Sequence, residues 1–197
     1  MRIEKPNIIL VGGGGHCVSV IDVIEHQGKY NIKGIIDINE NIGKDVLGYK
    51  IIGSDNDLQD LFLSCPNAIV SVGQIKSSAL RIHLFQKLKT IGYHLPIVIS
   101  PLAYVSKYAL IGEGSIIMHQ ALVNAGVKIG KNCIINTKAN IEHGVQIGNF
   151  CHISTGAIVN GDCIVSRETF IGSNATISNG VTIPPNSIIS AGEFVKR

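Results

Sequence analysis

Residues 129–159 read IGKNCI INTKAN IEHGVQ IGNFCH ISTGAI V, so an isoleucine or valine begins every block of six residues. The same spacing continues without a break over fifteen positions from Val105 to Ile189. The residue two before each of these positions is also restricted, and it is always Ala, Ser, Thr, Val or Cys. Two coupled columns of this length indicate a structural unit that repeats every six residues.

A period of six matches neither an α-helix nor the alternation of a simple strand. The small residue and the aliphatic that follows it are two apart, so both point inward from one short strand. Three such strands make a triangular coil, and coils stack about 4.8 Å apart through parallel pairing. We therefore predict a parallel β-helix of five coils over 97–197, in which residues 18 apart lie in adjacent coils. Glycines and asparagines directly after the aliphatic are expected to take the positive φ of each corner.

The first half of the chain, residues 1–96, has a different pattern, in which apolar strands alternate with helical segments. This alternation predicts a parallel sheet with helices, and hence a Rossmann-like α/β domain. The predicted strands cover 7–11, 33–36 and 68–72, and the predicted helices cover 18–25, 55–63 and 78–92.

A glycine cluster, Gly12 to Gly15, lies between the first strand and the first helix. Such a loop presents backbone N–H groups at a helix N-terminus, where they can bind phosphate, and Asp37 ends the second strand, where it can hold a ribose hydroxyl. The third glycine of a dinucleotide fingerprint is replaced by Cys17, and about 95 residues are too few for a dehydrogenase. We predict a mononucleotide ligand such as a nucleotide-sugar; the alternative is a sheet domain that only supports assembly. The expected substrate-binding residues here are Gly14, Gly15, His16, Asp37 and Gly73.

Composition excludes several other functions. The net charge is only +3 and there is no basic cluster, which argues against nucleic acid. No apolar run approaches the 18 residues of a membrane span, so a cytoplasmic location is expected. The five cysteines form no CxxC pair, which favours free thiols, and no metal is expected. Cys133, Cys151 and Cys163 fall in the small column and are expected in the core.

His143 is the strongest catalytic candidate in the repeat. It is expected at a corner, where the column of residues 18 apart reads Ala125, His143, Gly161 and Asn179. Small residues above and below leave open space beside the imidazole. His152 lies between two inward-facing residues, so its side chain is expected to point outward from a flat wall.

The segment 136–161, with Ile-Glu-His at 141–143, resembles the hexapeptide-repeat sugar acetyltransferases, in particular bacterial N-acetyltransferases of nucleotide-linked 4-amino sugars such as the UDP-bacillosamine-pathway enzymes. The resemblance implies a left-handed β-helix and a homotrimer with acetyl-CoA between subunits. It also implies that His143 is the general base. Members of the family carry an acid directly after the base; here that residue is Gly144, and Glu142 is the nearest substitute. The remaining expected contacts are His152, Gly161, Ser173 and Ala191 for acetyl-CoA and Asn136 for substrate.

The sequence therefore predicts acetyl transfer from acetyl-CoA to the 4-amino group of a nucleotide-linked 4-amino-4,6-dideoxy sugar, for bacterial surface glycan or glycoprotein synthesis. Two alternatives remain open. One is O-acetylation of a sialic-acid-type sugar, which depends more heavily on a well-polarised base. The other is a non-catalytic hexapeptide binding module.

Overall fold

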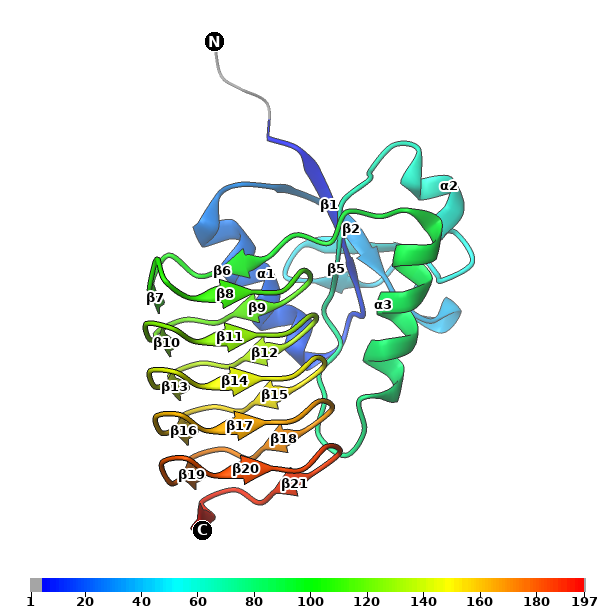
Figure 1. Cartoon of the computed structure of the whole chain (residues 1–197). Helices are drawn as coiled ribbons and strands as arrows, with labels where there is room; N and C mark the ends of the chain where they lie inside the picture. The colour runs from blue at the N-terminus through cyan, green and yellow to red at the C-terminus, as the bar shows by residue number, and fades with distance from the viewer. Residues whose placement is uncertain (1–4, 197) are drawn as a thin grey trace. The chain divides into compact units, whose positions relative to one another are not determined.

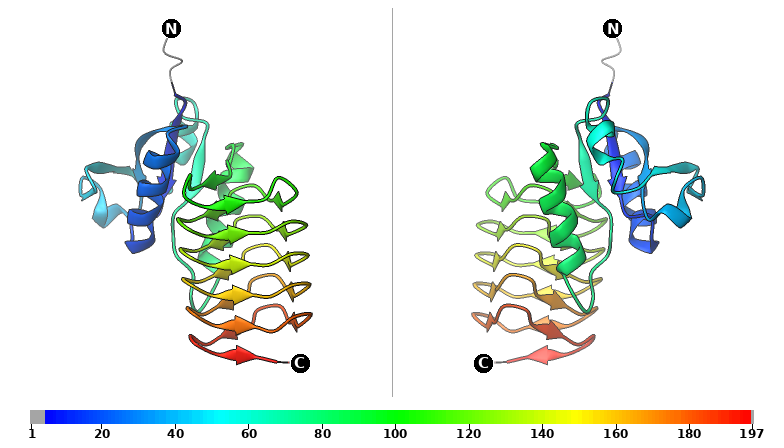
Figure 2. Two further views of the ribbon diagram at one scale, coloured as in Figure 1. Left: turned by 90° about the vertical axis from the view of Figure 1, so that its left-hand side faces the viewer. Right: turned by 90° about the vertical axis from the view of Figure 1, so that its right-hand side faces the viewer.

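The computed structural model describes residues 5–196, so both outer ends of the predicted domains lie outside the described residues. Its ribbon is drawn in Figure 1 and from two further sides in Figure 2. The chain forms two compact units: one contains the described residues up to Gly73 together with Leu80–Pro96, and the other contains Gln74–Ala79 and the residues from Ile97 onward. No helix within residues 5–196 is both long and apolar enough to cross a membrane.

The first unit is an α/β fold whose sheet has the strand order β3-β4-β2-β1-β5. All three predicted strands and all three predicted helices are present, with ends that differ by a few residues. The antiparallel hairpin β3–β4, which continues the sheet beyond β2, was not predicted. The elements are β1 (Asn7–Val11), α1 (Gly15–Gln27), β2 (Asn31–Ile36), a 3-10 turn (Asn39–Asn41), β3 (Asp45–Val46), β4 (Tyr49–Gly53), α2 (Leu58–Phe62), β5 (Ala68–Val70) and α3 (Ala79–Ile91).

The second unit is a triangular prism of two-residue strands (Figure 1). Each strand pairs in parallel with the strand 18 residues along the chain, for example Leu122 with Asn140, as predicted. The prism continues one strand beyond the predicted repeat at each end, to β6 and to β22. Its strands are β6 (Val98–Ile99), β7 (Tyr104–Val105), β8 (Leu110–Ile111), β9 (Ile116–Ile117), β10 (Leu122–Val123), β11 (Lys128–Ile129), β12 (Ile134–Ile135), β13 (Asn140–Ile141), β14 (Gln146–Ile147), β15 (His152–Ile153), β16 (Ile158–Val159), β17 (Ile164–Val165), β18 (Phe170–Ile171), β19 (Thr176–Ile177), β20 (Thr182–Ile183), β21 (Ile188–Ile189) and β22 (Phe194–Val195).

Three sheets form the walls of the prism, and each is named here by a central strand. The β13 wall has the order β22-β19-β16-β13-β10-β7, the β14 wall β20-β17-β14-β11-β8, and the β15 wall β21-β18-β15-β12-β9-β6. The aliphatic and small columns point inward and form one continuous core. Cys133, Cys151 and Cys163 are fully buried in it, and all five cysteines are free thiols, as predicted.

The corners differ from the prediction in where the positive φ falls. It occurs at the third residue after each aliphatic, for example at Gly144 (φ 70°) and Asp162 (φ 60°), and not at the residue that directly follows it. The glycines directly after the aliphatic are needed for a different reason. A Cβ on Gly130 or Gly148 would lie 2.6 or 2.5 Å from a backbone nitrogen of the next coil. These positions therefore set how closely the coils can stack.

Replacing Gly148 with alanine should test this close approach. The added methyl would meet the backbone of Arg167, which cannot move without breaking the strand pairing, so we expect a loss of about 1–3 kcal/mol of unfolding free energy. Gly15→Ala is the matched control, because a Cβ there meets nothing within 4 Å and the residue begins a helix. Chemical unfolding of the two variants measures the difference; equal stabilities would show that the coils can separate at this corner.

Candidate active site

A pocket of about 710 Å³ opens in the first unit beside the glycine loop. A Cβ on Gly12 would collide with Val72, and a Cβ on Gly13 would lie 2.8 Å from an Asp37 oxygen, so these two glycines allow tight packing. Gly14 and Gly15, in contrast, face open space, and helix α1 begins at Gly15. The N-terminus of α1 is therefore open to a ligand in the pocket.

Asp37 fixes the loop around this pocket. Its carboxylate accepts hydrogen bonds from the backbone N–H of Gly13, from the N–H of Ile38 at 2.7 Å and from the side chain of Asn41 at 3.0 Å. Partial burial raises the pKa of Asp37, but these hydrogen bonds, assisted by Lys44, outweigh it and hold the pKa below its ordinary value. Asp37 is therefore a stable anion at the pocket wall.

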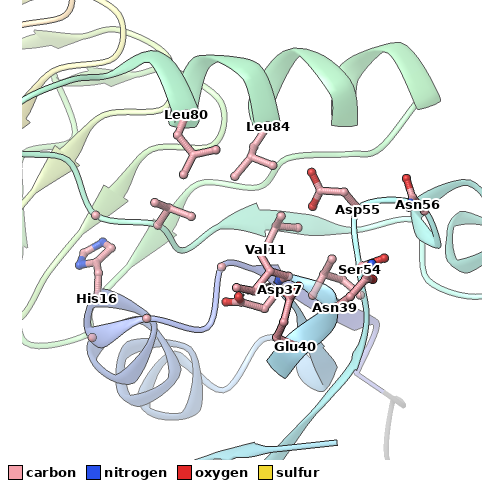
Figure 3. A pocket seen from close by; sticks show the side chains of 17 residues that line it. Val11, His16, Asp37, Asn39, Glu40, Ser54, Asp55, Asn56, Leu80 and Leu84 are labelled. Atoms are coloured by element: carbon pink, nitrogen blue, oxygen red, sulfur yellow. Dashed lines mark hydrogen bonds between the residues drawn. The ribbon is translucent and has the colours of Figure 1, made fainter. Parts of the chain in front are cut away.

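The pocket has an apolar side and a polar side. Figure 3 shows Leu80 and Leu84 of α3 across the cavity from Asp37, with His16 toward one end and Asp55 toward the other. An apolar wall can cover a flat ring, while the opposite wall offers hydrogen-bond acceptors. All five substrate-binding residues predicted in this unit line this one pocket: Gly14, Gly15, His16, Asp37 and Gly73.

His143 lies at the corner between β13 and β14, and its side chain is 62% exposed. Its imidazole covers Gly161 of the next coil so closely that a Cβ there would lie 2.7 Å from Nε2. Gly161 is therefore the residue that gives the imidazole its space. The ring is accessible to solvent and held beside exposed backbone, as an acid–base group requires.

An acid that the sequence reasoning missed lies beside this ring. The Oδ1 atom of Asp162, in the next coil, is 4.0 Å from Nδ1 of His143. Asp162 has a positive φ, and a Cβ on Gly144 would collide with its Oδ1. Residues 143 and 162 are 19 apart, which is one coil plus one residue, so the 18-residue column alone does not reveal the pair.

Glu142, the predicted substitute for the missing acid, points to a different partner. Its carboxylate accepts a hydrogen bond of 2.9 Å from the side chain of Asn124 in the preceding coil. This bond ties two successive corners together beside His143.

His152 points outward from the β15 wall, as predicted, but it is covered by the segment Gln74–Ala79 of the same unit. Its Nδ1 donates to the backbone carbonyl of Gln74 at 2.5 Å, so the neutral ring accepts at Nε2 from Asn136, 3.1 Å away. Only 6% of the residue is exposed. Both ring nitrogens are thus engaged within the chain, and Phe170 packs edge-on against the ring at 5.1 Å.

The remaining predicted residues lie at the corner between the β15 and β13 walls. Ser173 shares a hydrogen bond of 3.0 Å with Ser154, and Ala191 lies one coil further along the same column as Ser173. His143 and Gly161 occupy the next corner, where the β13 wall meets the β14 wall. The full width of the β13 wall therefore separates the two groups within one chain.

Family models match both units. The model for the PglD N-terminal domain matches residues 7–88, and the model described as the hexapeptide repeat of succinyl-transferase matches residues 126–160 and 164–197. Among curated proteins, no sequence matches the chain.

Solved structures resemble nearly the whole chain. PerB from Caulobacter crescentus, solved with CoA and GDP-perosamine, is 31% identical with a TM-score of 0.90, covering 100% of this chain and 92% of its own. The acetyltransferase domain of PglB from Neisseria gonorrhoeae, solved with acetyl coenzyme A, is 28% identical with a TM-score of 0.87, covering 96% and 90%. WeeI from Acinetobacter baumannii shares the fold at 21% identity and a TM-score of 0.75, covering 96% of each chain. These similarities confirm the predicted left-handed parallel β-helix behind an α/β domain.

The hydrogen bonds of Asp37 should make stability depend on pH. Because its folded pKa is below the ordinary value of 3.8, its contribution is complete above that value and is lost as pH falls through the folded pKa. Wild-type should therefore exceed Asp37→Asn in unfolding free energy at pH 7, and the gap should close below about pH 4. Urea unfolding at several pH values measures this, and a gap independent of pH would contradict it.

Proposed function

The chain belongs to the hexapeptide-repeat family of sugar N-acetyltransferases, and we propose that it acetylates the 4-amino group of a nucleotide-linked 4-amino-4,6-dideoxy sugar with acetyl-CoA. The observation that carries the proposal is the exposed imidazole of His143, held over Gly161 in a prism whose chain also builds a nucleotide-sized pocket. The relatives bind the matching ligands: acetyl coenzyme A in PglB, and CoA with GDP-perosamine in PerB.

The nucleotide would occupy the glycine-loop pocket. The phosphates fit the N-terminus of α1, where Gly14 and Gly15 leave space and free N–H groups concentrate positive potential. Asp37 would accept a ribose hydroxyl with its remaining lone pairs, since an ionised carboxylate accepts about four hydrogen bonds. Leu80 and Leu84 would cover the base.

The chemistry needs a base and an oxyanion donor. The amine nitrogen attacks the thioester carbonyl while Nε2 of His143 removes its proton, a contribution typically worth about 10²–10⁴-fold. The carbon–sulfur bond then breaks, and the imidazolium returns the proton to the sulfur of CoA. We assign Gly161 as a backbone N–H donor to the cofactor, because it approaches the ring more closely than any residue with a side chain could. No cysteine nucleophile is required, and the buried thiols take no part.

The separation of the two corners supports the proposal of a homotrimer with sites between prisms. The thioester would be bound by His143 and Gly161 from one subunit and by the corner with Ser173 and Ala191 from its neighbour. We propose that His152 and Asn136 contribute by fixing the wall of this groove, because their side chains bond to each other. The proposed substrates are charged metabolites that do not cross membranes unaided, which fits the expected cytoplasmic location.

Two alternatives use the same surfaces. An O-acetyltransferase of a sialic-acid-type sugar would keep His143 as base but would accept a hydroxyl. A binding module would not transfer acetyl groups at all. The amino sugar in the PerB complex favours the amine as acceptor.

Thiol release from acetyl-CoA tests the proposal directly. We expect release with one member of a panel of UDP-, dTDP- and GDP-linked 4-amino sugars, and a fall of about 10²–10⁴-fold in kcat for His143→Ala with acetyl-CoA binding retained. His83→Gln, which changes an exposed histidine on α3, is the matched control and should keep full activity.

Each other outcome has a defined meaning. Release only with sialic acid would establish O-acetylation, and His143→Ala with full activity would remove the assigned base. Failure to bind acetyl-CoA together with no release would favour the binding module.

Mixing two inactive variants tests the shared site. His143→Ala removes the base at one corner, and Ala191→Trp blocks the other corner of the same chain. If each site combines corners from two subunits, randomly mixed trimers should regain up to about one quarter of wild-type activity, because a quarter of the sites draw both intact corners. Co-expression and thiol release measure this; no recovery in mixed trimers of verified composition would place both corners in one subunit's site.

A further inference from the structure

The base at His143 needs a negative partner, and the chain supplies none at the usual position. An imidazole that accepts a proton becomes an imidazolium, which a nearby carboxylate stabilises. The residue after His143 is Gly144. The three stacked corners at 124–127, 142–145 and 160–163 carry only two charged side chains besides the histidine itself, Glu142 and Asp162.

The geometry separates the two acids. Glu142 bonds to Asn124, away from the ring, and Asp162 places Oδ1 4.0 Å from Nδ1 of His143. An ion pair at this separation needs only a small rotation of two exposed side chains to become a hydrogen bond. Nε2 is then left for the substrate, as a base that is oriented through its other nitrogen requires.

Two glycines make room for this pair. Gly161 lacks the Cβ that would displace the imidazole, and Gly144 lacks the Cβ that would collide with Asp162 Oδ1. An acid at position 144 and Asp162 in its present place therefore exclude each other. The glycine after the base follows from the carboxylate that arrives from the next coil.

The corner shape alone does not explain the charge. At another corner Asn174, with a φ of 56°, places its Oδ1 against Gly156 just as Asp162 does against Gly144. There an uncharged amide suffices, and the residue before the glycine is Thr155. The carboxylate occurs where that preceding residue is His143.

We infer that Asp162 is a positioning residue that orients His143 through Nδ1 and stabilises its imidazolium. When Nε2 takes the proton of the attacking amine, Nδ1–H donates to Asp162 Oδ1, and the carboxylate stays ionised. The proton leaves again from Nε2 to the CoA sulfur. This role rests on the proposed function of His143, while the proximity of the two charges does not.

Titration of His143 by NMR, with histidine labelled at Cε1, tests the inference without any acceptor. The full-length protein is used, and the signal is assigned with His143→Gln. Asp162→Asn keeps the side-chain shape, since Asn174 adopts the same conformation, and we expect the pKa of His143 to fall by about half a unit to one unit because both groups are exposed and screened. The fall should shrink in 1 M salt.

The kinetic arm separates orientation from folding. With the acceptor found active, Asp162→Asn should lower kcat about 5–50-fold with little change in KM, and the acidic limb of its pH profile should move to lower pH. Asp60→Asn on α2 controls for the loss of an exposed carboxylate. The inference is overturned if the Asp162→Asn titration coincides with wild-type, or if Glu142→Gln shifts it by more. An unchanged titration refutes Asp162 alone, whereas absent transfer with a shifted titration refutes the proposed reaction alone.

Discussion

Parallel pairing at a spacing of 18 residues is the constraint on which the prism depends. Each strand is only two residues long, so no strand is stable alone, and its backbone groups are satisfied by the coils on either side. Pairing this close requires that nothing protrude at the corners, which is why Gly130 and Gly148 cannot carry a side chain. The same closeness brings side chains of successive coils into contact, and so creates the surroundings of His143.

Much of the fold could be predicted because its causes are local. The two inward columns are visible in the sequence, and they determine strand positions, coil length and core. The glycine loop and Asp37 follow strands, so their meeting at one sheet edge also follows from the order of elements. The hairpin at β3 and β4 was missed because its short strands lack a clear alternation.

The site was less predictable because its contacts join residues with no periodic relation. Gln74 covers His152 from 78 positions away, and nothing in the repeat indicates that this wall is occupied. Asp162 reaches His143 because its backbone takes a positive φ, a property placed at the wrong corner residue by composition alone. Backbone conformation, which decides where a corner side chain points, is not encoded in hydrophobic periodicity.

The two units divide the molecular task in a way the chemistry requires. The α/β unit holds a carboxylate whose hydrogen bonds keep it ionised, and the prism offers an imidazole in open surroundings. Nucleotide affinity and proton transfer can therefore change independently, since no residue serves both.

The coil spacing also changes how such sequences should be compared. Wound onto the prism, the chain becomes a grid in which each residue has neighbours at one place and at 18 or 19 places along. A functional pair can then move from adjacent letters to letters a full turn apart while its atoms stay together. Alignments that score only consecutive positions will register this as a lost residue, whereas a comparison made on the wound grid will find it displaced by one turn.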